Sequence, residues 1–211
     1  MVDFMKSHRL VFYIDGFNLY FGLKSRGWRK YYWLDLQEMC LRLTKPHQEL
    51  VKVRYFTARI NQAAESKRRR QLTYLEAVET LPLVEVHYGT YLATSQTCFR
   101  CGHTFVKHNE KKSDVNIAVK LITDAMEDLY ESAVLISADS DLTPAVEAVR
   151  KYFPDKKVLL FFPPKRSSLS LRKACHVYCG VLNKTTISKS QLPETVLSKS
   201  GYPLKRPKYW T

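Results

Sequence analysis

Short apolar segments alternate with longer amphipathic segments along most of the chain. The short segments are rich in branched and aromatic residues, which favour strands, and they span residues 10–14, 50–57, 83–88, 133–137 and 157–162. Residues 176–182 are a candidate for a last, short strand. Because these segments are mostly apolar on both faces, we expect a largely parallel sheet that helices cover on both sides.

The segments between the expected strands carry apolar residues at the spacing of a helix. Helices are predicted over residues 35–43, 63–81, 113–130 and 143–152, with a shorter one over residues 168–174. Pro82 ends the second helix, and Thr143 followed by Pro144 is typical of a helix start. Within residues 113–130, the apolar stripe expected to face the core comprises Val115, Ala118, Val119, Ile122, Met126 and Leu129.

Strands that alternate with helices predict an α/β fold with a mostly parallel five-stranded sheet. One domain is expected over residues 1–182, with an inserted hairpin at residues 89–110. Residues 183–211 are rich in Ser, Thr, Pro and Lys and show little apolar periodicity. We therefore expect this basic C-terminal extension to be extended or poorly ordered.

Aspartates stand where expected strands end or where an expected helix begins. Asp15 ends the first strand, Asp139 and Asp141 follow the fourth, and Asp114 opens the helix at residue 113. The carboxyl ends of parallel strands meet in one crevice, so these four side chains are expected close together. Such a cluster is costly unless a hard divalent cation such as Mg²⁺ neutralises it, which makes the four residues candidate metal ligands.

Each of these acids except one also has a simpler interpretation. Asp15 precedes a glycine and fits a turn, Asp114 would offset a helix dipole, and Asp141 could cap the next helix. Asp139 has no such simple role, because a charge at the end of an apolar strand needs a partner. Asn18 could join the water shell of a metal or hold a carboxylate in place.

The charge balance of the chain points to a polyanionic partner. The formal net charge is +14, and the sequence pI is about 9.6. Simple solubility is the alternative explanation. Candidate phosphate-binding residues are Lys165, Arg166 and Ser167 beyond the fifth strand, and Lys111 with Lys112 before Asp114, although a solvated basic loop would look the same.

Two further basic stretches carry less information. Residues 67–70 fall on the solvated face of a predicted helix and are expected to be surface charge. Residues 26–33, with the sequence RGWRKYYW, interleave aromatic rings with cations. This pattern fits a base-stacking platform, and it fits a partly buried aromatic lid equally well.

The sequence CFRCGH at residues 98–103 contains a zinc-knuckle half-site. Cys98 and Cys101 are the surest ligands, and His103 with His108 could complete a structural zinc site. The alternative is a pair of reduced cysteines on the inserted hairpin. The odd total of five cysteines argues against a disulfide framework.

No apolar run is long enough to cross a bilayer, and the first apolar segment contains Asp15. That segment fits a first strand better than a signal peptide, so we expect a cytoplasmic protein without a membrane partner. The proportions of 45% hydrophobic and 26% charged residues are typical of a globular domain.

Three motifs together resemble the NYN-domain family of PIN-like nucleases. They are IDGFN at residues 14–18, EKKSDVNIAVKLITDA at residues 110–125 and LISADSDLTPAVEAVR at residues 135–150, in the order that the family has. The resemblance covers roughly residues 9–181, and it departs at Ala138, where the family often has Gly.

This resemblance implies a three-layer α/β/α fold and a metal-dependent ribonuclease activity. It implies Asp15, Asp114, Asp139 and Asp141 as ligands of Mg²⁺ or Mn²⁺, with Asn18 assisting. We therefore expect an endoribonuclease that hydrolyses RNA. The sequence leaves its oligomeric state open, and a homodimer is compatible with it.

Two alternatives stay open at this point. One is a non-catalytic nucleic-acid-binding module that kept the fold. The other is a phosphatase of the haloacid dehalogenase type, because Asp139, Asp141 and Thr143 fit a DxDxT motif. That motif normally starts its domain, and too little chain follows Thr143 to supply the remaining strands and acids.

Overall fold

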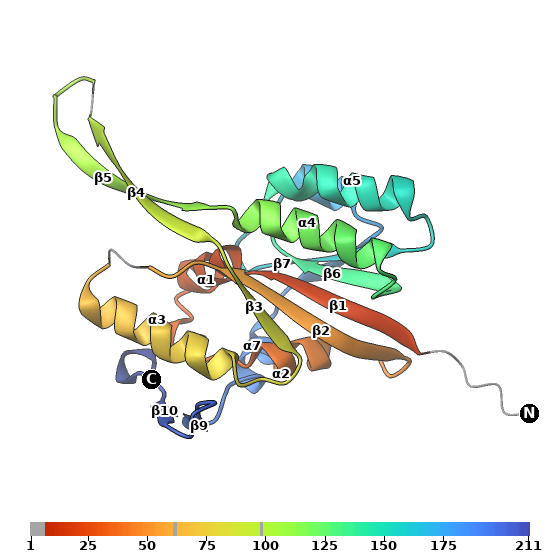
Figure 1. Ribbon diagram of the computed structural model, residues 1–211, viewed down its shortest axis with the longest axis horizontal. Helices are drawn as coiled ribbons and strands as arrows, with labels where there is room; N and C mark the ends of the chain where they lie inside the picture. Colours follow the sequence, from red (N-terminus) through yellow and green to blue (C-terminus); the bar gives the residue numbers. More distant parts are fainter. Residues whose placement is uncertain (1–6, 61–62, 98) are drawn as a thin grey trace, which may run out of the picture.

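The computed structural model describes residues 7–60, 63–97 and 99–211, without the side chains of residues 91–95 and 105–111. Six parallel strands form its central sheet, in the order β3-β2-β1-β6-β7-β8 (Figure 1). These strands are β1 (His8–Asp15), β2 (Gln48–Thr57), β3 (Val84–Tyr88), β6 (Ser132–Ile136), β7 (Lys157–Phe162) and β8 (Val177–Val181). The candidate last strand is thus confirmed as β8, which gives six strands where five were expected.

Helices cover both faces of the sheet, so the predicted three-layer α/β/α fold is confirmed. One face carries α4 (Ser113–Met126), α5 (Thr143–Tyr152) and α6 (Leu169–Ala174). The other carries α1 (Gly16–Ser25), α2 (Leu36–Leu43), α3 (Glu65–Val78) and α7 (Lys184–Lys189). Alternate residues of β1 enter the two cores: Tyr13 packs under α4, and Phe12 packs under α1 and α2. In the part of the chain that is described, no helix is long and apolar enough to cross a membrane.

The strand order reverses direction between β1 and β6, at the centre of the sheet. From β1 the chain adds β2 and β3 on one side, and β6, β7 and β8 then extend the sheet on the other. Ile14 of β1 pairs with Ile136 of β6, so Asp15 and Ser137 leave the sheet at the same level. A crevice outside the carboxyl ends of strands at such a reversal is the usual binding site of an open α/β sheet.

The helix α1 begins directly after Asp15, where the sequence indicated only a turn. Asp15 caps this helix by accepting a hydrogen bond from the backbone N–H of Asn18. Gly16 is required at the first position, because a Cβ there would lie 2.7 Å from the carbonyl oxygen of Phe56. Gly22 likewise lets α1 approach Pro164. Two glycines in ten residues weaken the helical signal of the sequence.

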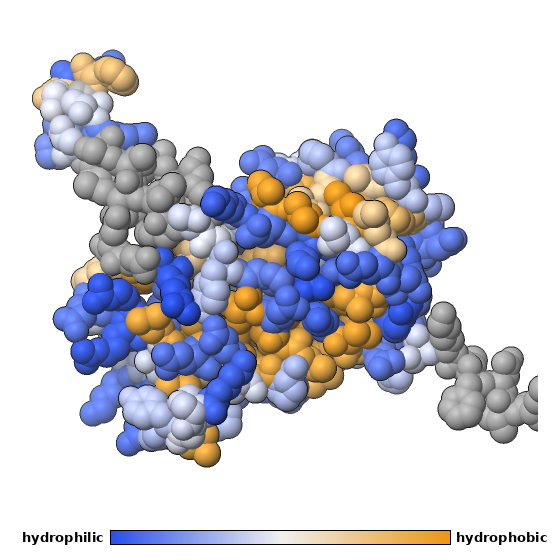
Figure 2. Space-filling view, in the orientation of Figure 1, coloured by the Kyte–Doolittle hydropathy of each residue, from blue (hydrophilic) through white to orange (hydrophobic). Residues whose placement is uncertain are grey.

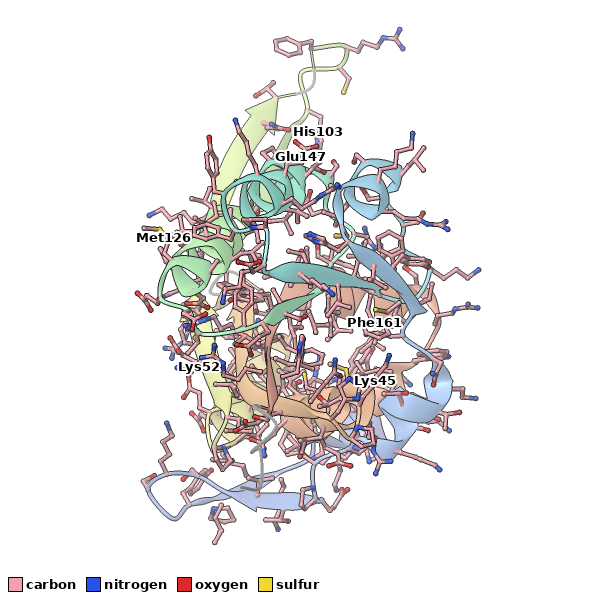
Figure 3. All side chains as sticks on the ribbon, turned by 90° about the vertical axis from the view of Figure 1, so that its right-hand side faces the viewer. Lys45, Lys52, His103, Met126, Glu147 and Phe161 are labelled. Carbon is pink, nitrogen blue, oxygen red and sulfur yellow. The ribbon has the colours of Figure 1, made fainter. Side chains whose placement is uncertain are left out.

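The buried face of α4 differs from the stripe that the sequence predicted. Ile117, Leu121 and Ala125 face the core, whereas Val115, Val119 and Met126 are 62%, 52% and 68% exposed. Figure 2 shows apolar residues at the surface over α4 and α5, and Figure 3 places Met126 on the outer side of the helix. The prediction was right for Ala118, Ile122 and Leu129, which pack against the core. It was wrong for the other three residues, because it overlooked the buried Asp124.

Asp124 orients α4 through a buried ion pair with β2. Its Oδ1 atom accepts a hydrogen bond of 2.7 Å from Nη2 of Arg54, and its Oδ2 atom accepts from Nε of the same guanidinium. The hydroxyl of Tyr13 on β1 donates a further hydrogen bond of 2.6 Å to Oδ2. Asp124 and Tyr13 are 0% exposed, and Arg54 is 4% exposed, so Asp124 depends on Arg54 for its neutralisation. Arg54 also pairs with the part-exposed Glu85, at 2.8 Å.

A hairpin and a folded C-terminal segment extend this core. The hairpin of β4 (Thr90–Thr97) and β5 (Thr104–Lys111) projects away from the sheet (Figure 1). After α7 come β9 (Thr195–Leu197), β10 (Pro203–Lys205) and the 3₁₀ helix η3 (Lys208–Trp210). The expectation of an extended or poorly ordered tail was wrong, because Trp210 is buried against Trp33 and Tyr74.

Replacing Asp124 by Ala should lower the free energy of unfolding by about 3 kcal/mol, because the buried Arg54 guanidinium would keep only the part-exposed Glu85 as a charged partner. The double variant Arg54→Met/Asp124→Leu should recover most of this loss, since neither charge then remains. Urea denaturation measures both, with the exposed Asp155→Ala as the control. A loss below about 1 kcal/mol for Asp124→Ala would contradict the role of the pair.

Candidate active site

Asp15 lies at the carboxyl end of β1 and is only 7% exposed. Its carboxylate accepts hydrogen bonds from the backbone N–H of Asn18 at 2.9 Å, from Nδ2 of Asn18 at 2.7 Å and from Oγ of Ser137 at 2.9 Å. Burial raises the pKa of Asp15, and these hydrogen bonds oppose the rise by favouring the charged form. The nearby charge of Asp139 raises the pKa further.

A chain of hydrogen bonds leads from Asp15 to the loop after β6. Ser137, which donates to Asp15, accepts a hydrogen bond of 3.0 Å from the backbone N–H of Asp139. Asp139 in turn caps the 3₁₀ helix η2 (Ser140–Leu142) by accepting from the N–H of Asp141 at 3.0 Å. Asp139 therefore has a structural role that the sequence did not reveal, and it is the capping acid where Asp141 was expected.

Asp114 and Asp141 belong to the same edge of the sheet but are exposed to solvent. Asp114 lies in the first turn of α4, next to the exposed Lys112, whose φ of 78° is left-handed. The start of α4 packs beside η2, because Ile117 and Leu142 share one core. The side chain of Lys111 lies outside the described residues.

The basic rim follows β7. Lys165 and Ser167 are exposed, and Arg166 is half-buried with its guanidinium 5.8 Å from the ring of Phe21 on α1. The hydroxyl of Ser168 caps α6 by accepting a hydrogen bond from the N–H of Leu171. This loop therefore lies beside the second half of α1, the helix that begins at Asp15.

The carboxylate oxygens at this edge are suitable ligands for a hard cation that keeps part of its water shell. Asp15 and Asp139 are close enough for their charges to interact, and carboxylate oxygens are the ligands that Mg²⁺ prefers, usually one or two together with several waters. Among the side chains that the structure describes, no group of three or more from Asp, Glu, His or Cys converges on one metal position. The structure thus brings Asp15 and Asp139 together and leaves Asp114 and Asp141 at the periphery.

The candidate zinc ligands lie on the hairpin. Cys101 and His103 are exposed in its turn, and Figure 3 shows His103 away from the sheet, whereas Cys98 lies outside the described residues. His108 pairs with Ala93, four residues along β5 from the last pair of the hairpin, Thr97 with Thr104. At about 3.3 Å per residue this is roughly 13 Å, which argues against His108 as a partner of ligands in the turn. Zinc at the turn stays a prediction.

The aromatic segment at residues 26–33 is mostly packed against the protein. Trp33 is 0% exposed and donates a hydrogen bond of 2.7 Å to the carbonyl of Pro193, while Tyr32 contacts Trp210 edge-on. Of the two interpretations, the partly buried lid agrees with this packing.

The structure has a cavity beside α1 that the sequence did not predict. It measures about 410 Å³ and is lined by α1, α3, the end of β2 and the C-terminal segment, including Arg70 and Tyr209. Residues 67–70 were predicted to be surface charge, but two of them, Lys67 and Arg70, line this cavity. The signal was present, because Arg70 and Tyr74 are four residues apart and share one helix face.

Comparison with known proteins adds a family and two relatives. The profile of the NYN domain matches residues 9–187. The 6-hydroxy-3-succinoylpyridine 3-monooxygenase HspA of Pseudomonas putida is 24% identical, over 96% of this chain and 75% of its own length. A protein of unknown function from Vibrio parahaemolyticus has a similar structure, with a TM-score of 0.56, 17% identity, and coverage of 84% of this chain and 94% of its own.

The raised pKa of Asp15 makes a pH-dependent prediction. A carboxyl whose folded pKa exceeds its unfolded value favours folding at low pH, and this contribution is lost as the pH rises through the folded pKa. Asp15→Asn cannot ionise, so in EDTA its Tm relative to the parent should rise from about pH 4 to about pH 7. Thermal denaturation across that range measures the difference, and a constant or falling difference would contradict the burial argument.

Proposed function

The chain belongs to the NYN domain family, and on this premise we propose that it is a metal-dependent endoribonuclease that hydrolyses RNA. The observation that carries the proposal is the buried Asp15 at the reversal of strand order, linked through Ser137 to the loop of Asp139. A carboxylate retained in so buried a position, in a crevice and beside a second carboxylate, is typical of a functional site.

Each acid has a role in this proposal. Asp15 and Asp139 would hold Mg²⁺ or Mn²⁺, and Asp114 and Asp141 would complete the set of acids around the ion. The bound ion would polarise the scissile phosphate and lower the pKa of an attacking water. Asn18 and Ser137 keep the Asp15 carboxylate ionised and aimed at the crevice, through the hydrogen bonds that they donate.

The basic rim supplies the attraction for a substrate that the acids would repel. Lys165, Arg166 and Ser167 after β7, with Lys111 and Lys112 before α4, contact phosphates on either side of the scissile bond. The net charge of +14 supports a polyanionic substrate of this kind.

Two other enzyme classes, a phosphatase and a monooxygenase, differ in their support. The NYN match gives no support to a phosphatase, and the DxDxT-like sequence follows β6, inside the sheet, where that class needs it on the first strand of the domain. The name of the Pseudomonas putida relative makes ring hydroxylation of a hydroxypyridine a second candidate. The aromatic-lined cavity favours it, and product formation from 6-hydroxy-3-succinoylpyridine with O₂ and a two-electron reductant tests it.

Asp139→Asn should abolish RNA cleavage and leave RNA binding within about twofold, because the variant loses a metal ligand and keeps an oxygen that can cap η2. The measurement is cleavage of a mixed RNA pool with Mg²⁺ or Mn²⁺, with an EDTA control and product ends mapped by sequencing. Asp155→Asn, an exposed acid after α5, is the matched control and should cleave as the parent does.

Three outcomes are distinct in that experiment. Cleavage that disappears with EDTA and with Asp139→Asn supports the nuclease. Binding without any metal-dependent cleavage by the parent supports the non-catalytic module. Cleavage that survives in Asp139→Asn means that a contaminating nuclease or another site is responsible.

The double variant Lys165→Ala/Arg166→Ala should weaken RNA binding and flatten its salt dependence. Each phosphate contact to single-stranded nucleic acid contributes a slope of about −0.7 in a plot of log K against log salt, so the loss of two contacts should reduce the slope by about 1.4. Fluorescence anisotropy in EDTA measures this slope. Lys157→Ala, an exposed lysine at the opposite end of β7, should leave it unchanged.

A further inference from the structure

The cavity beside α1 has the size and lining of a ligand site. Its volume of about 410 Å³ falls within the range of small-molecule pockets, which run from about 300 to 1,000 Å³. Gly16 and Phe17, the residues that follow Asp15, form one end of the cavity, and Tyr209 and Trp210 of η3 form another. The C-terminal segment thus completes a wall that the rest of the chain leaves open.

Aromatic rings make up much of the wall. Tyr20 and Tyr32 lie with ring centroids 5.1 Å apart and both line the cavity together with Tyr209. Burial raises the pKa of Tyr32 to about 12, and it raises the pKa of Tyr20 too, so both hydroxyls stay protonated and can donate hydrogen bonds. Planar faces with donors at their edge suit a flat heterocycle.

The charge of the cavity is entirely positive. Lys24, Lys67 and Arg70 line it, and none of the described lining residues is acidic. The guanidinium of Arg70 lies 4.4 Å from the ring centroid of Tyr209, and that of Arg29 lies 4.4 Å from the same ring. A ligand with a negative group is therefore favoured over a neutral or cationic one.

The cavity adjoins both the acids and the basic rim. Gly16 follows Asp15 directly, and Phe21, which lines the cavity, carries the guanidinium of Arg166 over its ring. Beyond Tyr209 lies a second hollow of about 560 Å³, lined among others by Lys205, Lys208 and the ion pair of Arg69 with Glu65. A basic path thus leads from the rim past the cavity mouth and along η3.

We propose that this cavity receives one unpaired nucleobase of the RNA, with the adjoining phosphate on Arg70 and Lys67. Bases of a duplex are paired and stacked, so only single-stranded or looped RNA can place a base in this cavity, against the rings of its wall. The cavity would make the enzyme selective for unpaired RNA close to the scissile bond. This inference rests on the proposed function for the identity of the ligand as RNA.

The test compares binding of a single-stranded RNA of about ten nucleotides with binding of its duplex, by anisotropy with EDTA present so that no cleavage occurs. Tyr209→Ala and Arg70→Gln should each weaken single-strand binding about tenfold and change duplex binding less than twofold. Tyr209 is 54% exposed, so its loss is compatible with folding, which circular dichroism verifies. The matched controls are Arg68→Gln on the exposed side of α3 and Tyr152→Ala at the end of α5.

A second measurement identifies the ligand class. Trp210 lines the cavity, so AMP and UMP should quench its fluorescence, and Trp210→Phe should remove the quenched signal. Quenching by nicotinate, a planar aromatic carboxylate, with none by the nucleotides would overturn the nucleobase and indicate a small aromatic acid. No quenching by any of these probes, with equal single-strand binding by the parent and both cavity variants, would overturn the site altogether.

The base site and the nuclease activity can be tested separately. Metal-dependent cleavage that the cavity variants leave intact on single strands would overturn the base site and keep the endoribonuclease. Cavity-dependent binding of single strands without any cleavage would support the base site on a non-catalytic module.

Discussion

A carboxylate that is almost completely buried at the end of a central strand constrains the whole carboxyl edge of this sheet. Asp15 needs hydrogen-bond donors there, because an ionised oxygen without partners would not tolerate burial. The donors come from the first turn of α1, through Asn18, and from the end of β6, through Ser137. Satisfying one side chain therefore fixes the start of a helix, the level of a neighbouring strand and the loop that carries Asp139.

A second buried charge sets the position of α4 against that edge. The Arg54–Asp124 pair joins the helix to β2, and Tyr13 of β1 donates to the same carboxylate, so rotation of α4 about its axis would leave charges unpaired. The first turn of α4, with Asp114 and Lys112, is thereby held beside η2. The ion pair thus fixes an orientation of α4 in which some apolar residues, such as Val119, are exposed.

The sequence predicted what depends on local pattern and on strand direction. The α/β fold follows from the alternation of strands and helices. The closeness of Asp15 and Asp139 follows because each comes directly after an apolar strand of one parallel sheet. It did not predict the buried face of α4, because Asp124 finds its partner on a strand 70 residues earlier. Nor did it predict the folded tail, since the packing of Trp210 on Trp33 links residues at opposite ends of the chain and has no local signature.

Because the C-terminal segment is folded, α1 lies between two features of the molecule. One side of this helix meets the loop of Pro163 and Pro164, which leads to the basic rim, and the other side faces the cavity that η3 closes. Phe21 belongs to both, because it lines the cavity and lies under Arg166. Because α1 begins at the cap residue Asp15, a ligand that presses on Phe21 or Tyr20 acts on the same short helix that holds the carboxylate. The wall of the cavity and the hydrogen-bond donors of Asp15 therefore come from one helix of ten residues.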